Sequence, residues 1–399
     1  MRPSYCALPV IIITTFLIAT TLMTMLVMVT AAHAIPYRPA SPAQIVDTLP
    51  VGSLTFQQRV PMQVGRKLSL DDIMVQANVL VARAYSAGDP RDLGQAEALL
   101  APYAKVQTPE LRLIRANIYQ ASHRFEQARQ QLQQILKQLP NQPDSLFMLA
   151  SINLVQGQFT AARRQCNQLQ DVSLLVLKMI CGAQVDSMTG SLRASAETIG
   201  QLMQVNSGLT VEQQRWLYLI AADIALRHDD AALATQVFRR MDTQSAPALT
   251  ARADWLLAHQ QWDKTRQLLS QSTDNDSLLL RLLISEQQLK DPKASAHAKL
   301  LAQRIAIWQQ RGEVAHQREQ AQFAYVVGHF DQALKLARLN WQKQRETADV
   351  VIYAHAALRA HSQPDINAIQ YWMAQTGFEY PQLAKALQAN TLEQQRPLQ

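Results

Sequence analysis

The chain has 399 residues, with 48% hydrophobic side chains, only 17% charged side chains and a formal net charge of +7. That length exceeds one compact core of ordinary size but suits a repeat array. Only 12 residues are Gly, while Ala, Leu and Gln recur throughout, so the composition favours helices and argues against a sheet-based fold. The basic residues are dispersed rather than clustered, which is typical of a solvated surface.

Residues 1–34 differ from the rest, with Arg2 as their only charged residue. An apolar run follows from Ala7 and ends in the small-x-small pattern of Ala32 and Ala34. This order predicts a secretory signal peptide, which would place the remaining chain in the periplasm, away from nucleic acid. Because the run is also long enough to span a bilayer, the alternative is an inner-membrane anchor with a periplasmic domain. Membrane contact is otherwise expected only through partners.

Residues 35–68 contain five prolines, at positions 36, 39, 42, 50 and 61. Since Pro removes a backbone donor and blocks the helix interior, a continuous helix is excluded here. We therefore predict a proline-rich lead-in segment.

From Ser69 the pattern becomes helical, and similar units start at Pro109 and, 34 residues later, at Pro143. Both units have small residues at matching places, and an aromatic residue follows each inter-helix turn. A further clear copy contains Ala321, Gly328, Phe330 and Ala333. The residues predicted to pack the helix pairs are Ala116, Tyr119, Phe125, Ala128, Pro140, Ala150, Gly157, Phe159, Ala162, Ala321, Gly328, Phe330 and Ala333.

This pattern resembles the tetratricopeptide repeat (TPR) family, whose units place small residues at their eighth and twentieth positions, where Ala116 and Ala128 stand. The resemblance implies an all-α solenoid in which antiparallel helix pairs stack, because one hairpin cannot bury its apolar faces alone. Looser copies extend the array to about eight or nine pairs over residues 69–389, followed by a polar tail at 390–399. A non-repetitive helical bundle is the alternative, but it does not account for the regular spacing.

Three further segments resemble a group of uncharacterised exported TPR proteins of Gram-negative bacteria. They are residues 88–94 (GDPRDLG), 162–166 (ARRQC) and 340–346 (NWQKQRE). The resemblance spans most of the chain after the signal segment and implies fold and export, without a biochemical role.

Two cysteines, Cys166 and Cys181, remain after the signal segment. An even pair in an oxidising compartment predicts a disulfide. The alternative is two small buried apolar residues on neighbouring helices.

The TPR resemblance also implies a binding surface on the concave face, which the first helix of each pair lines. Amides there can bond a peptide backbone, and aromatic rings can hold its side chains. The apolar members can equally be packing residues between repeats. The candidate positions are Asn117, Gln120, Phe147, Ser151, Leu154, Trp216, Asp223, Asp254, Arg318, Gln322, Tyr325 and Tyr353.

Catalytic motifs are absent from the sequence: it has no phosphate-binding loop, no H-E-x-x-H, no G-x-S-x-G and no C-x-x-C. We therefore expect a chain without enzyme activity, cofactor or metal. The leading hypothesis is an exported scaffold or adaptor that binds a protein or peptide in the bacterial envelope. The alternative is an accessory subunit of a periplasmic enzyme or of a transport or assembly complex.

Overall fold

The computed structural model describes residues 68–88, 91–205, 208–310 and 317–394, all within the helical unit that begins at Lys67. The predicted signal segment, and the lead-in except for Leu68, lie outside the described residues. The described residues contain helices and no strand. None of these helices has the length and apolar character needed to cross a membrane.

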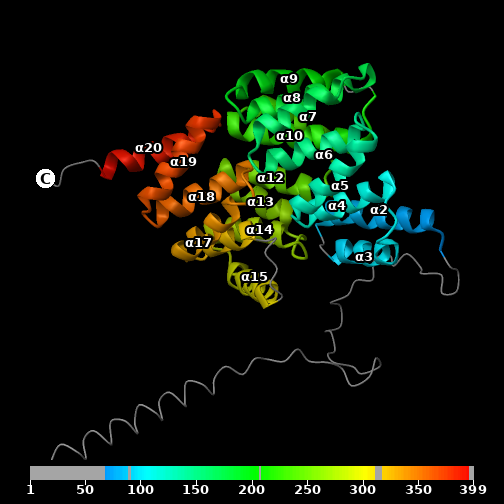
Figure 1. Ribbon diagram of the computed structural model, residues 1–399. Helices are drawn as coiled ribbons and strands as arrows, with labels where there is room; N and C mark the ends of the chain where they lie inside the picture. Colours follow the sequence, from blue (N-terminus) through cyan, green and yellow to red (C-terminus); the bar gives the residue numbers. More distant parts are fainter. Residues whose placement is uncertain (1–67, 89–90, 206–207, 311–316, 395–399) are drawn as a thin grey trace, which may run out of the picture. The chain divides into compact units, whose positions relative to one another are not determined.

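Nineteen α-helices in the described residues form nine antiparallel pairs and a final single helix (Figure 1). Pairs 1–3 are α2 Leu70–Ala87 with α3 Arg91–Leu100, α4 Pro109–Ala121 with α5 Phe125–Gln138, and α6 Pro143–Val155 with α7 Phe159–Gln168. Pairs 4–6 are α8 Leu175–Ser187 with α9 Leu192–Val205, α10 Val211–His228 with α11 Ala231–Arg240, and α12 Ala246–Ala258 with α13 Trp262–Leu269. Pairs 7–9 are α14 Asp276–Leu289 with α15 Lys293–Gln310, α16 Gln317–Val326 with α17 Phe330–Trp341, and α18 Thr347–Arg359 with α19 Gln363–Thr376. The last helix is α20 Pro381–Gln394.

The solenoid of TPR-like helix pairs predicted from the sequence is therefore confirmed. The array begins where the periodicity starts, with Ser69 capping α2 in a capping box with Asp72. At its other end the unit finishes with α20, which ends at Gln394.

Small residues allow the two helices of a pair to approach closely. Ala116 and Ala128 of pair 2 are fully buried, and so is Ala162 of pair 3. The turn between the two helices of pair 3 contains Gly157 at φ +71, a left-handed conformation that favours Gly. His123 takes the same role in pair 2 at φ +56.

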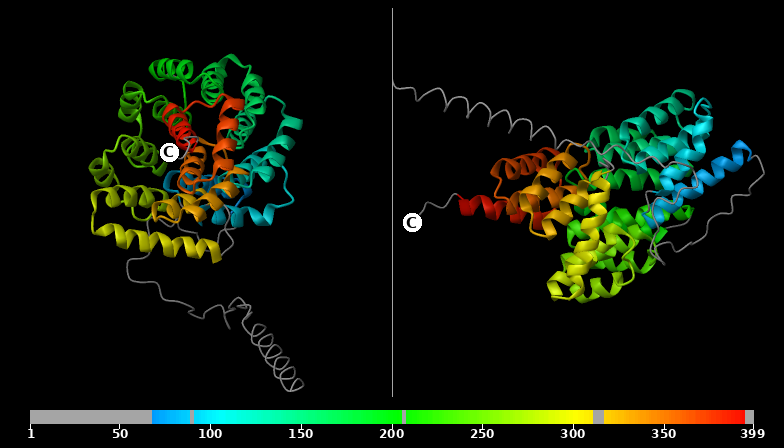
Figure 2. Two further views of the ribbon diagram at one scale, coloured as in Figure 1. Left: turned by 90° about the vertical axis from the view of Figure 1, so that its left-hand side faces the viewer. Right: turned by 90° about the horizontal axis from the view of Figure 1, so that it is seen from below.

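The helical unit winds so tightly that its early and late pairs touch. Helix α2 of pair 1 packs against α12 of pair 6, and α20 packs against α10. In the left view of Figure 2, α18–α20 project inside the ring drawn by the earlier pairs. The later pairs therefore form a second superhelical turn against the first.

The two superhelical turns meet along a contact that we call the joint: the turns within pairs 1–4 face the loops that precede α12, α14, α18 and α20. Asn275 Nδ2 donates to Ala87 O at 2.9 Å. Arg345 N donates to Val155 O at 2.7 Å. Leu192 N donates to Glu379 Oε2 at 3.2 Å. Backbone groups take part in each of these three bonds, so the joint aligns main chain as well as side chains.

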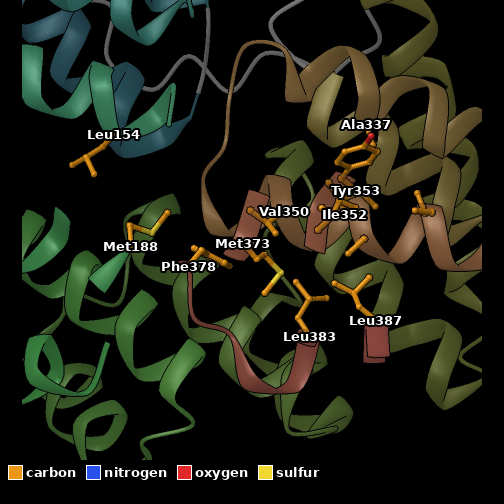
Figure 3. Packing of buried hydrophobic residues seen from close by; sticks show 14 of the residues in the cluster. Leu154, Met188, Ala337, Val350, Ile352, Tyr353, Met373, Phe378, Leu383 and Leu387 are labelled. Carbon is orange, nitrogen blue, oxygen red and sulfur yellow. The ribbon is translucent and has the colours of Figure 1, made fainter. Parts of the chain in front are cut away.

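A single apolar cluster crosses the joint. Leu154 and Met188 belong to the first superhelical turn, whereas Met373, Phe378 and Leu383 belong to the second, and all five are buried. Figure 3 shows these side chains between ribbons that are far apart in the sequence. The joint is thus part of the hydrophobic core.

Candidate binding surface

The apolar residues predicted for the concave face lie in or against the cluster at the joint. Leu154 and Tyr353 are buried members of it, and Phe147, Trp216 and Tyr325 pack against it from partly buried positions. The rings of Phe147 on α6 and Trp216 on α10 meet edge to face, with centroids 4.2 Å apart. The structure thus brings these five residues together as packing between helices.

Tyr353 also has a polar role. Its hydroxyl donates to Asp365 Oδ1 at 2.7 Å, and Arg338 Nε donates to the same oxygen at 2.8 Å. Burial and the bond to Asp365 raise the pKa of Tyr353. The hydrogen bond from Arg338 lowers the pKa of Asp365 to about 2, with help from Ser362 and Tyr353. This network ties α17 to α18 and α19.

Asp223 and Asp254 lie on neighbouring inner helices and keep part of their surface in solvent, with side chains 38% and 32% exposed. Asp223 accepts from the buried Arg227, Nε to Oδ2 at 2.9 Å. Asp254 accepts two bonds from Arg281, at 2.6 and 2.9 Å. These arginines fix the carboxylates in place, so each presents a defined acceptor.

Tyr380, from the segment before α20, lies near these carboxylates. Burial raises its pKa to about 12, and the negative charges of Asp223 and Asp254 act in the same direction. A phenol hydroxyl of this kind stays protonated at neutral pH and can donate a hydrogen bond. The inner surface here therefore combines two held acceptors with one donor.

Arg318 is a charged residue enclosed by acidic partners. Its Nη1 lies 3.0 Å from Glu346 Oε2 and 3.5 Å from Asp349 Oδ1. Burial alone would lower the pKa of Arg318, but the charges of Asp349 and Glu346 outweigh it and raise that pKa. Burial in turn raises the pKa of Asp349 to about 6. Arg318 thus links α16 to the start of α18 through ion pairs.

The remaining polar candidates fall into two places. Gln120 Nε2 lies 3.4 Å from Ser151 Oγ, which links pairs 2 and 3, and Asn117 lies one helical turn earlier on α4. Gln322 lies on α16, partly exposed. Gln322 thus belongs to pair 8, whereas Asn117, Gln120 and Ser151 belong to pairs 2 and 3.

Cys166 of α7 and Cys181 of α8 are bonded to each other, with Cα atoms 5.6 Å apart. Both are buried, at 1% exposure. The bond closes the loop between pairs 3 and 4, where Asp171 Oδ1 also accepts from Ser173 N at 2.8 Å. The disulfide therefore fixes the two ends of this loop, and the Asp171–Ser173 hydrogen bond fixes its middle.

Sequence reasoning missed the joint and the residues that form it. Arg227 is fully buried and donates to Ser187 O at 2.7 Å and to Ser187 Oγ at 2.9 Å, and its guanidinium lies over the Phe378 ring. Glu379 and Tyr380 come directly after Phe378, in the segment before α20, and also belong to the joint. A repeat pattern in the sequence predicts only the packing of neighbouring pairs. It therefore contains no signal for contacts such as that of α2 in pair 1 with α12 in pair 6.

No family model matches the chain, and no curated protein matches it. Among solved structures the chain is similar to the crystal structure of the yeast Tom70, with a TM-score of 0.27 and 11% sequence identity. That alignment covers 82% of this chain and 89% of the other. At such a TM-score the similarity carries no weight, and the solenoid assignment rests on the helix pairs themselves.

Proposed function

We propose that this protein is an exported, non-catalytic scaffold that binds a segment of another protein on its inner surface, beside α10, α12 and the segment before α20. The observation that carries this proposal is that the partly exposed carboxylates of Asp223 and Asp254 both lie near Tyr380. Carboxylates accept from backbone N–H groups and from Lys or Arg side chains, and the phenol donates to a carbonyl.

Preorganisation supports this site over the other predicted positions. Arg227 and Arg281 hold the two carboxylates, so little side-chain entropy is lost when a ligand binds. The aromatic positions Phe147, Trp216 and Tyr353 already have partners within the chain. We expect the bound segment to be extended and to contain a basic side chain.

The experiment places a photo-cross-linking amino acid at Tyr380 in the full chain, in cells. Tyr371 is the matched control, because it is a tyrosine on α19 that is 68% exposed. We expect a covalent adduct with one defined protein at position 380, absent at 371 and weakened by Asp254→Asn. Adducts of equal yield at both positions, or none at 380, would overturn the assignment.

Export is tested separately by sequencing the amino terminus of the protein recovered from the periplasm. A start at Ile35 supports cleavage of the signal segment. An intact terminus in the membrane fraction supports the anchor.

A further inference from the structure

The joint uses only one edge of each superhelical turn. Within the joint, turns inside early pairs cover loops between late pairs. The joint does not cover the loops that connect successive pairs from pair 1 to pair 5. It also does not cover the turns within pairs 6–9. We call the first set the loop rim (residues 101–108, 139–142 and 169–174 and the adjoining ends of α8, α9 and α10). We call the second set the turn rim (259–261, 290–292, 327–329 and 360–362).

The loop rim carries five of the twelve large apolar side chains that the described residues leave in solvent, including Val172, the most exposed of them. Five large apolar side chains lie on it: Val172 is 87% exposed, Val205 and Val211 63% each, Leu175 53% and Leu139 46%. No large exposed apolar side chain is found on the turn rim as described. A solenoid end that faces water needs a polar surface, so the loop rim is not built as a capped end.

The protruding part of the loop rim is rigid. The Cys166–Cys181 bond and the Asp171 turn hold the loop that carries Val172. A preorganised apolar side chain loses little entropy on docking, which is the property of an interface anchor.

The turn rim offers the complementary shape. Between the turns of pairs 8 and 9 lies a surface hollow lined by polar and charged side chains (His329, Asp331, Gln332, Arg359 and His361) together with Gly328, Phe330 and Ala360. A Cβ added at Gly328 would meet nothing within 4 Å, so the floor of this hollow is open.

The turn rim also repeats the backbone features that the joint uses. Gly328 has φ +86, as Gly157 has φ +71 in pair 3, where Arg345 packs against it. His361 has φ +52, as His123 has φ +56 in pair 2, where it bonds Gln344 at 3.1 Å. Inside the chain, such turns cover loops and bury an apolar residue, Phe378, which is 4% exposed.

We propose that the loop rim of one copy docks on the turn rim of a second copy, continuing the joint from one molecule to the next. The contact is heterologous, because different surfaces meet, so copies add head to tail. The occupant is a second copy rather than a membrane or another protein, since this chain already pairs the same kinds of turn and loop within itself.

The experiment measures the mass of the purified full chain by analytical ultracentrifugation across concentrations. We expect a mass that rises with concentration in the parent chain. Val172→Asp should weaken association at least about tenfold, and so should Gln332→Arg, which blocks the hollow. Tyr371→Asp, at an exposed site outside both rims, is the control and should associate like the parent.

A mixing experiment then tests the head-to-tail geometry. Val172→Asp keeps a sound turn rim and Gln332→Arg keeps a sound loop rim, so the mixture should form dimers and nothing larger. Four results would overturn the proposal: a parent chain that stays monomeric, loss of association in Val172→Asp alone, blocked variants that fail to pair on mixing, or flotation with lipid vesicles that depends on Val172. The third of these indicates a symmetric dimer or another contact, and the fourth a membrane surface.

Discussion

Gly377 is the residue at which the joint is most sensitive to a single added carbon. It precedes α20 at φ +72, and a Cβ there would lie 3.0 Å from Gly190 N and 3.0 Å from Thr189 C. Both neighbours are backbone atoms, which cannot rotate away as a side-chain tip can. Gly377→Ala therefore forces the two superhelical turns apart.

Two terms set the size of the effect. The left-handed backbone costs a residue with a Cβ about 1–2 kcal/mol. Overpacking against fixed atoms adds about 1–3 kcal/mol. We expect Gly377→Ala to lower the free energy of unfolding by about 2–5 kcal/mol.

Two other glycines separate these terms. Gly328 has φ +86 and open space around it, so Gly328→Ala should lose only the backbone term. Gly200 lies in helix α9 with nothing within 4 Å of a Cβ, so Gly200→Ala should gain about 0.5–1 kcal/mol.

The assay is urea unfolding followed by circular dichroism, at a protein concentration where the parent is monomeric. Hydrogen exchange should show faster exchange in α20 and α10 for Gly377→Ala alone. Equal losses in Gly377→Ala and Gly328→Ala would refute the reasoning, because the joint would then contribute nothing at this position.

Three further predictions concern single contacts. Reduction of the Cys166–Cys181 bond should lower the free energy of unfolding by about 3 kcal/mol on the chain-entropy model. Reductant should therefore lower the melting temperature of the parent chain, whereas it should not change that of a variant in which both cysteines are replaced by Ala. The pKa of Asp365 is lower in the folded chain than in the unfolded one, so its stabilisation exists above pH 4 and is lost towards about pH 2. Asp365→Asn should flatten that part of the acid unfolding curve, and an unchanged curve contradicts the network. Arg227→Met leaves the buried carbonyl and hydroxyl of Ser187 without their guanidinium donor and should cost about 1–3 kcal/mol in urea unfolding. A loss below about 0.5 kcal/mol would show that the joint does not depend on it.

Local features of the fold follow from the sequence. Small residues such as Ala116 and Ala128 mark where two helices of a pair meet, and their zero exposure follows from that spacing. Start signals such as Ser69 and Pro109 place the helix ends, because capping depends on the nearest residues only.

The winding of the solenoid does not follow from the same pattern. It depends on small rotations between successive pairs, which accumulate until Gly190 meets Gly377. For this reason, the family register predicts positions on the concave face but does not predict the contact between the rings of Phe147 and Trp216. The Tyr380 hydroxyl could not be assigned, since it reaches the inner surface through the joint.

The joint also changes how the chain is expected to fold. A repeat array is a one-dimensional system in which each unit depends on its neighbours, so contact order is low and folding can spread from any pair. Bonds such as His123 with Gln344 span 221 positions and couple both ends of the array. During synthesis from the amino terminus, pairs 1–4 emerge first and must keep their joint surface uncovered until the last helices arrive. Closure of the joint is then a late, slow step that turns a string of separable units into one cooperative body.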